Sequence, residues 1–439
     1  MISKSGIQYT SAIALLTMLG VQSAQAGLKQ IEIKGGVSTA AHTIDFGDQT
    51  DSGILMDGDL DFKMKFSQDV SARFDLEFDN AVGNYGAAAN AGATNRFDIG
   101  VDQAYFKLND FLFRNFSMTA GKQNFDVSLR DNGTNSWAFG DPVALVGAYA
   151  TRDMDIKGYY LKQNEDKIGT YTSATTVAGV TTPGYYNSND MDAEVLGTTG
   201  EYWLNDDSLV MAYLNYKSVN GGVMKTTYDN LFHYGVGLDY FIGESLEVYG
   251  ELAGQSIDGK TSATDGSAFQ VTLGGEYAFS DYSMKPTVGL EYYLQSGKDT
   301  NDPAWQNVAG GKSSSDTDSL FMEASGSTRD INAGAGYVNK SGNGSMGPDG
   351  YSVIRVNGSI SPSKSTKVGL GVHFFKNEDS IGVTEDNLGT EIDLYTNWKY
   401  SQDITFRAGA FFVPEANPTG IANTDKNISG IAASSSLVF

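Results

Sequence analysis

The segment "GDLDFKMKFSQDVSARFDLEFDN" (58–80) alternates apolar and charged residues, and this alternation recurs along most of the chain. Leu60 and Phe62, for example, flank Asp61. Because successive side chains of a β-strand point to opposite faces, the pattern predicts two strands joined by a tight turn at 67–69. Each strand then has one apolar and one charged face, so the fold has to provide an apolar medium for the first and water for the second.

The same alternation predicts strands from the start of the chain to its last residue. They lie at 29–45, 54–66, 70–80, 97–108, 115–126, 142–151, 154–164, 193–204, 208–219, 230–242, 245–257, 267–279, 284–297, 350–361, 365–377, 388–400, 403–414 and 427–439. Short connections such as "SQD" (67–69) and "GE" (243–244) alternate with long ones such as 165–192. This order is typical of outer-membrane barrels with short periplasmic turns and long extracellular loops. The predicted fold is therefore all-β, a transmembrane antiparallel β-barrel of about 18 strands (16–18) over residues 27–439.

The composition agrees with a β-rich chain. It has 24 Tyr, 23 Phe and 52 Gly against 8 Pro, and no Cys for disulfides. The chain has no run of about 18 apolar residues after its N-terminal segment, so the sequence predicts no transmembrane helix there. The net charge of −23 argues against a nucleic-acid partner.

The two ends of the sequence predict export and membrane insertion. Lys4, the apolar run 12–21 and "SAQA" ending at Ala26 predict a secretory signal peptide over 1–26, although a signal anchor has the same general pattern. The terminal Phe439 predicts recognition by the barrel-assembly machinery. The expected location is the bacterial outer membrane, with lipid and lipopolysaccharide as partners.

The alternation also predicts which charged side chains face a water-filled interior. These pore-lining candidates are Asp59, Asp61, Lys63, Lys65, Arg73, Asp75, Glu77, Glu247, Glu251, Glu276, Glu291, Arg355, Lys367, Glu391, Asp393 and Arg407. Acids outnumber bases, which favours mild cation preference, while an unselective polar wall remains the alternative. Two loops are candidates for narrowing the channel: 130–142, with Trp137 and Phe139, and 298–349, read either as extracellular or as folding inward.

Enzymatic chemistry has little support in the sequence. The three histidines, His42, His233 and His373, have no Ser, Asp or metal-ligand partner at a useful spacing, and we expect no catalytic residues, no metal site and no cofactor. Loop-bound Ca²⁺ is an alternative for the acidic segments within 298–349, but their spacing matches no defined calcium loop.

Two segments resemble a known family. "LGTEIDLYTNWKYSQDITFRAGAFFVPEANPTG" (388–420) resembles the late segment of the alginate-export outer-membrane proteins, and "TAGKQNFDVSLRDNGTNSW" (119–137) is similar to their Gly-Arg-Gln strand and inward loop. Phosphate-selective porins share a Gly-Lys-Gln strand of the same kind. The resemblance implies an 18-stranded barrel and export of a polyanion. Lys122 replaces the motif's Arg, however, and acids replace the family's strongly basic lumen.

The sequence thus predicts a non-enzymatic porin for passive diffusion of small hydrophilic solutes or ions. Two alternatives remain open at this point. One is an exporter of an anionic polysaccharide, and the other is a plugged structural or adhesive barrel that acts through its loops. The sequence does not settle the oligomeric state.

Overall fold

The computed structural model describes residues 27–45, 50–83, 97–124, 126–127, 137–138, 142–163, 170–172, 175–177, 180–182, 185–187, 193–219, 228–259, 265–297, 320, 350–378, 387–416 and 426–439. Within these ranges the chain forms strands and turns and no helix. No described segment is a helix long and apolar enough to cross a bilayer.

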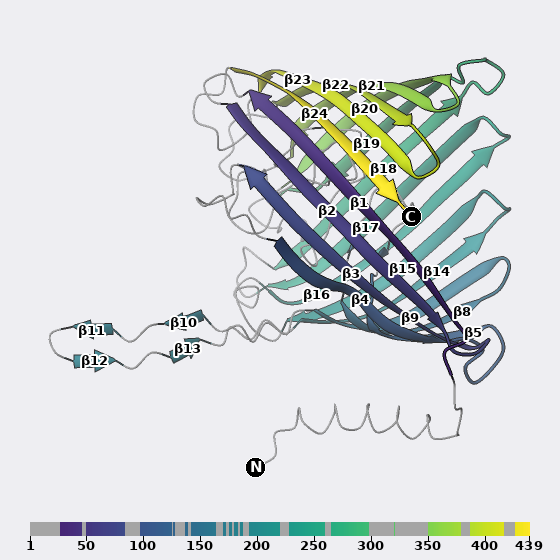
Figure 1. The fold of residues 1–439 in the computed structure, drawn as a ribbon, viewed down its shortest axis with the longest axis vertical. Helices are drawn as coiled ribbons and strands as arrows, with labels where there is room; N and C mark the ends of the chain where they lie inside the picture. The colour runs from purple at the N-terminus through teal and green to yellow at the C-terminus, as the bar shows by residue number, and fades with distance from the viewer. Residues whose placement is uncertain are drawn as a thin grey trace, which may run out of the picture.

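Eighteen strands form one antiparallel sheet (Figure 1). They are β1 (Gln30–Asp45), β2 (Thr50–Lys65), β3 (Val70–Gly83), β4 (Phe97–Leu108), β5 (Phe116–Lys122), β8 (Val143–Ala150), β9 (Met154–Gln163), β14 (Ala193–Trp203), β15 (Leu209–Val219), β16 (Tyr228–Ile242), β17 (Leu246–Gly259), β18 (Gly266–Ala278), β19 (Thr287–Gln295), β20 (Tyr351–Ser363), β21 (Thr366–Asn377), β22 (Asn387–Lys399), β23 (Ile404–Ala416) and β24 (Lys426–Val438). Each corresponds to one predicted strand.

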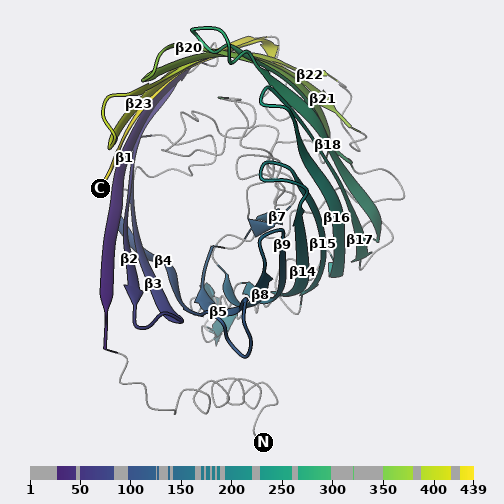
Figure 2. The same ribbon diagram turned by 90° about the vertical axis from the view of Figure 1, so that its right-hand side faces the viewer.

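The sheet closes into a barrel (Figure 2). β1 pairs with β2 on one side and with β24 on the other, which joins the first strand to the last. At this seam the backbones of Gly35 and Phe439 exchange hydrogen bonds of 3.0 and 2.9 Å. The predicted fold class, a closed antiparallel barrel of 18 strands, is confirmed.

The two ends of the barrel differ in their connections. The turns that join β2 to β3, β4 to β5, β8 to β9, β14 to β15, β16 to β17, β18 to β19, β20 to β21 and β22 to β23 are short and lie at one end, on the right in Figure 1. We call this the short-turn end. At the opposite end, which we call the long-loop end, the connections include the long segments 84–96, 164–192 and 296–350, although 46–49 between β1 and β2 is short.

The outer face carries an apolar band. On β16 the outward side chains are Phe232, Tyr234, Val236, Leu238, Tyr240 and Ile242, all exposed. Val236 and Leu238 lie in the middle with aromatic residues on both sides, and Ile242 ends the row at the short turn. Phe232 and Ile242 are ten positions apart (242 − 232 = 10). This spans about 33 Å of strand, or about 25 Å along the axis of a barrel whose strands tilt by about 40°. The dimension matches the hydrocarbon core of an outer membrane.

Aromatic side chains gather on the outer face beside the short turns. One group consists of Trp398, Tyr400 and Phe406, in which the Trp398 ring centroid lies 5.5 Å from each of the other two. Tyr277 and Phe279 form another. Amphipathic rings of this kind collect where hydrocarbon meets the polar head groups.

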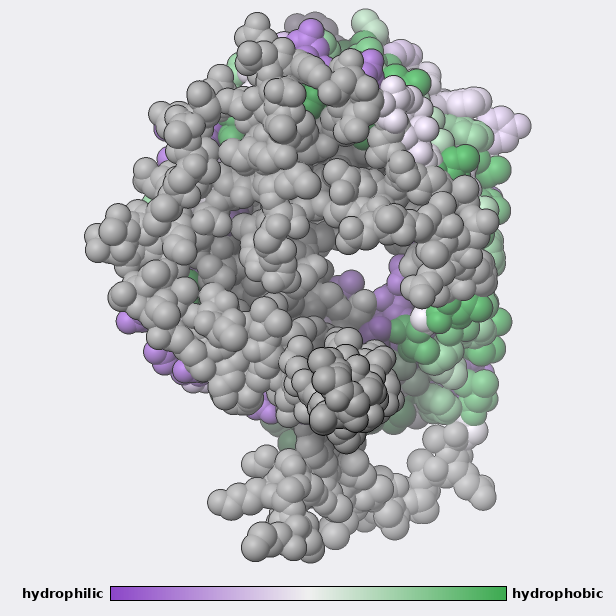
Figure 3. Space-filling view, turned by 90° about the vertical axis from the view of Figure 1, so that its left-hand side faces the viewer, coloured by the Kyte–Doolittle hydropathy of each residue, from purple (hydrophilic) through white to green (hydrophobic). Residues whose placement is uncertain are grey.

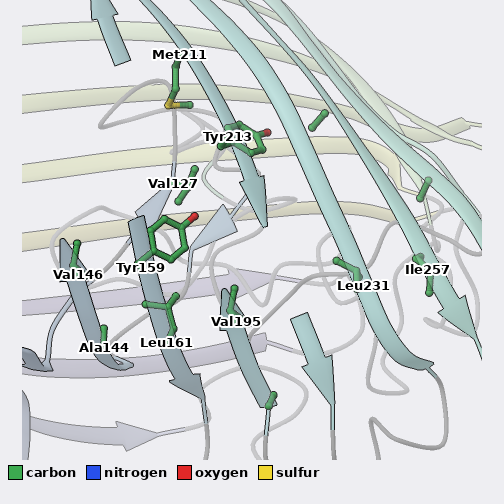
Figure 4. Packing of buried hydrophobic residues seen from close by; sticks show 13 residues of the cluster. Val127, Ala144, Val146, Tyr159, Leu161, Val195, Met211, Tyr213, Leu231 and Ile257 are labelled. Atoms are coloured by element: carbon green, nitrogen blue, oxygen red, sulfur yellow. The ribbon is translucent and has the colours of Figure 1, made fainter. Parts of the chain in front are cut away.

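The inner face is identified by what packs against it. The short strands β6 (Asp126–Val127) and β7 (Trp137–Ala138) pair with each other, and Figure 2 shows β7 inside the ring. Val127 is buried in a cluster with side chains of β8, β9, β14, β15, β16, β17 and β18, including Tyr159 and Leu161 (Figure 4). A second cluster contains Leu320 together with Tyr293, Val353 and Phe375 among its members. The rows that contribute to these clusters therefore face inward.

These clusters differ from the uniformly polar interior that the alternation suggests. Leu161, Val195 and Leu231 face inward and have no exposed surface, and they lie in the long-loop half of the barrel. They belong to the cluster that contains Val127 of β6, and burial in this cluster stabilises inward apolar side chains that an open lumen would leave wet.

The predicted strand at 115–126 is partly wrong. β5 ends at Lys122, and Asp126–Val127 forms the separate strand β6. Gly121 has a φ of +134°, and a Cβ there would lie 2.2 Å from the backbone oxygen of Ala104, so only glycine fits. The chain leaves the wall beyond this glycine, which alternation alone does not reveal.

The sequence also predicts no strands within 165–192. There β10 (Thr170–Thr172) pairs with β13 (Tyr185–Asn187), and β11 (Thr175–Val177) pairs with β12 (Val180–Thr182). The Thr, Val and Tyr residues of this segment favour strands. The two strand pairs are nested in the sequence and form two separate two-stranded sheets, which Figure 1 shows beyond the long-loop end.

The outward and inward rows predict opposite responses to charge. Leu76→Arg on the outward row of β3 should destabilise the barrel in lipid by roughly 2–4 kcal/mol, the cost of an arginine near the bilayer midplane. The matched variant Glu77→Arg, one residue along on the inward row and opposite Asp59, should change stability little. Urea unfolding in lipid vesicles measures both, and equal losses would contradict the assigned faces.

Candidate functional site: the charged inner wall

The charged residues predicted to face the interior occupy the inward rows. Ile44 of the second cluster pairs with Asp51 of β2, and because cross-strand partners share a face, the odd-numbered residues of β2 point inward. Exposed or partly exposed are Asp59, Lys63, Lys65, Arg73, Glu77, Glu247, Glu276, Lys367 and Arg407. Buried or nearly so are Asp61, Asp75, Glu251, Glu291, Arg355, Glu391 and Asp393. Their role as a pore wall remains a prediction.

On β2 and β3, Arg73 joins two acids. Its Nε donates to Asp61 Oδ1 at 2.8 Å and its Nη2 to Asp75 Oδ2 at 3.0 Å, while Nη1 donates to Gln103 Oε1 at 3.1 Å. Lys63 Nζ lies 3.3 Å from Asp61 Oδ2. Asp61 is directly opposite Asp75 in the register, so Arg73 offsets a repulsion between like charges.

A smaller group lies on β9 and β14. Lys157 Nζ lies 3.3 Å from Asp155 Oδ2 and 3.5 Å from Glu201 Oε1, and all three side chains are partly exposed. The sequence analysis missed these residues, although each stands at an inward position of a predicted strand and could have been found by the same alternation.

The wall formed by β19 to β22 carries a row of charged groups in direct register. Glu291 lies opposite Arg355, Arg355 opposite His373, and His373 opposite Glu391. Arg355 forms an ion pair with Glu291, and His373 Nε2 lies 3.2 Å from Asp393 Oδ2. We call Glu291, Arg355, His373, Glu391 and Asp393 the shielded group.

Aromatic groups and burial complete this arrangement. Tyr249 donates its hydroxyl to Glu291 Oε2 at 2.7 Å, and the Arg355 guanidinium lies 5.6 Å from the centroid of the Tyr293 ring. Arg355 is 2% exposed, and His373, Glu391 and Asp393 have no exposed surface. Glu291 and Arg355 are thus paired and hydrogen-bonded, which offsets the cost of burying their charges.

One residue of the predicted 298–349 loop contacts this wall. The backbone N–H of Leu320 donates to Asp393 Oδ2 at 3.3 Å, and its side chain is buried in the second cluster. The remaining residues of 298–319 and 321–349 lie outside the described residues.

The predicted constriction loop is described only in part. Trp137 belongs to β7, and its backbone pairs with Val127 of β6 inside the ring. Phe139 lies outside the described residues, as does the predicted signal peptide at 1–26.

Inward tyrosines are functional candidates that the charge pattern did not reveal. Tyr213 donates to Glu251 Oε1 at 2.7 Å, and Tyr159 donates to Asn215 Oδ1. Tyr213 lies against Gly235 on the next strand, where a Cβ would come within 2.2 Å of the tyrosine hydroxyl. Only knowledge of the strand register could have predicted this pairing.

The described residues offer no site for a metal ion. No group of three His, Asp or Glu side chains among them is arranged to hold one.

A closed antiparallel barrel of 18 strands is the fold of outer-membrane porins. The structure is similar to Acinetobacter baumannii OccAB4, with a TM-score of 0.55, 10% identity, and 95% of this chain and 100% of that chain covered. It is also similar to Pseudomonas aeruginosa OccK8 (OprE), with a TM-score of 0.56, 11% identity, and 94% and 98% covered. For Pseudomonas aeruginosa OccK5 (OpdH) the TM-score is 0.55 at 12% identity, with 94% and 98% covered.

At these identities the likeness establishes the porin fold. No family model matches the sequence, and no curated protein matches it. The structural comparisons support a porin barrel and give no support to the alginate-export or phosphate-selective resemblance.

The Arg73 contacts predict a specific loss of stability. Arg73→Met leaves Asp61 and Asp75 opposed without their cation, which should cost about 3 kcal/mol, at the low end for a buried pair because Arg73 is partly exposed. Lys63→Met, at a side chain that is about half exposed, should cost at most about 1 kcal/mol. Urea unfolding measures both. The triple variant that adds Asp61→Asn and Asp75→Asn should recover most of the loss, and failure to recover would show that packing, not charge, is responsible.

Proposed function

We propose that this protein is an outer-membrane channel for passive diffusion of small hydrophilic solutes or ions. One observation carries the proposal: an apolar outer band with aromatic ends surrounds inward rows of charged side chains in a closed barrel. Lipid satisfies the outer face and water the inner one. Transport then follows the gradient of the solute itself, and no residue performs chemistry.

The proposal places the mature chain in the outer membrane after removal of a signal peptide. Lipid and lipopolysaccharide would contact the outer face, and the barrel-assembly machinery would recognise Phe439. The backbone of this residue pairs with Gly35 at the seam, which supports a role for the C-terminus in closing the barrel.

Cell fractionation tests this location. The protein should be recovered with the outer membrane, and it should run anomalously on denaturing gels until it is boiled, because a closed barrel resists detergent unfolding. Deleting Phe439 should reduce recovery of the heat-sensitive form. Recovery of the full chain as a soluble periplasmic protein would contradict the proposal.

Ion selectivity is expected to be mild and cationic. The sixteen predicted pore-lining residues include ten acids and six bases. Among those that are exposed or partly exposed, however, the four acids Asp59, Glu77, Glu247 and Glu276 face the five bases Lys63, Lys65, Arg73, Lys367 and Arg407, so the preference should be small. A carboxylate acts over about 8 Å at physiological salt, so the preference should weaken as salt rises.

Reversal potentials in a salt gradient across a planar bilayer measure this preference. We expect mild cation selectivity at low salt, reduced in the double variant Asp59→Asn with Glu77→Gln. Firm anion selectivity would contradict it and would favour export of an anionic polysaccharide, the function suggested by the resemblance of 119–137 and 388–420.

A second candidate is a structural or adhesive barrel whose lumen is largely filled. The two inward apolar clusters and the contact of Leu320 with Asp393 favour it. Single-channel recording separates the two functions, because a filled barrel conducts little.

A further inference from the structure

The two charged walls of the barrel differ in access to water. On the β2–β3 wall, the Lys63 side chain is 48% exposed and that of Arg73 is 26% exposed. In the shielded group, on β19 to β22 and separated from β2 by β23, β24 and β1, the residues His373, Glu391 and Asp393 have no exposed surface. An ion in the lumen therefore meets Lys63 and Arg73 directly and does not meet His373, Glu391 or Asp393, while Asp61 and Asp75 of the first wall are covered by their contacts with Arg73.

The register of the β2–β3 wall places like charges opposite each other at positions that water reaches. Asp59 lies opposite Glu77, just as Asp61 lies opposite Asp75. Like charges directly across a strand pair are destabilising unless solvent or a counterion offsets them. Arg73 offsets the second pair, and the partial exposure of Asp59 and Glu77 gives water access to the first.

The shape of the molecule agrees with this division. Figure 3 views the long-loop end and shows hydrophilic residues in the interior, to the right of centre, the side on which the β1 to β4 strands of Figure 2 lie when the molecule is seen from this end. The apolar clusters occupy the inward faces of other strands: the first spans β8 to β18, and the second is built mainly on β19 to β24.

We infer that solutes and ions pass along the β2–β3 wall, and that Asp59, Lys63 and Glu77 determine selectivity while the shielded group only stabilises the barrel. This inference rests on the proposed channel function. It divides the predicted pore-lining residues into a wet set and a dry set, and it assigns the cation preference to the acids of a single hairpin.

The chain has no cysteine, so single cysteines report access without background. In the refolded full-length barrel, Asp59→Cys and Glu77→Cys should react with a water-soluble cationic thiosulfonate reagent, detected as a mass increase. Asp393→Cys, which removes the same charge, should not react until the barrel is unfolded. Because Asp393→Cys can fail to fold, Asn377→Cys on β21 serves as a second buried position outside the β2–β3 wall, with heat-dependent gel mobility as the folding check.

The same variants are then recorded in bilayers. Labelling Asp59→Cys should shift the reversal potential away from cations, while reagent treatment of folded Asp393→Cys or Asn377→Cys should leave it unchanged. Equal labelling of the two walls in a conducting barrel would overturn this inference and leave the channel function intact. A complete lack of conductance in the unsubstituted barrel would instead overturn the proposed function.

Discussion

Closure of the sheet is the constraint on which the rest of the structure depends. A strand in an apolar medium cannot leave its backbone N–H and C=O groups without partners, and each of the eighteen sheet strands has a neighbour on both sides. The last contact to satisfy is the seam, where β1 meets β24 and Gly35 meets Phe439. Once the ring is closed, a slip of one residue would exchange the inner and outer faces of a strand, so the register is fixed all the way round.

This constraint explains which features could be predicted from the sequence. The alternation of apolar and charged residues predicts that Leu60 faces outward and Asp61 inward, without any knowledge of the neighbouring strands. It also predicts that Glu391 and Asp393, far along the chain, face inward. Strand number, pairing order and facing depend on this local pattern and on closure. Whether an inward side chain is buried does not follow from the local pattern, because burial depends on segments that are distant in sequence. Asp393 is buried where Leu320 contacts it, and Leu161 is buried in the cluster that contains Val127.

Inward aromatic residues follow the same logic at shorter range. Tyr395 lies opposite Gly369, where a Cβ would come within 2.1 Å of the ring, and Tyr213 lies on Gly235 in the same way. A ring that covers a glycine of the next strand lies along the wall and not across the lumen. A bulky residue can thus face inward without blocking the barrel. The sequence contains both members of each pair, but only the register brings them together.

The two charged walls also differ in which charges lie opposite each other, and this difference matches their exposure to water. β2 and β3 form a hairpin whose charges are arranged almost symmetrically about the turn, so Lys63 meets Arg73, Asp61 meets Asp75 and Asp59 meets Glu77. A hairpin of this kind must oppose like charges, and it is tolerable only with water or a bridging cation nearby. On β19 and β20, Glu291 and Arg355 are 64 residues apart in sequence and form an acid–base pair. Burial is possible there because opposite charges meet, since an isolated buried charge would be far more costly than a paired one. The order of charges in the β2–β3 hairpin therefore favours side chains that are exposed to water. The register of β19 to β22 permits buried charged side chains.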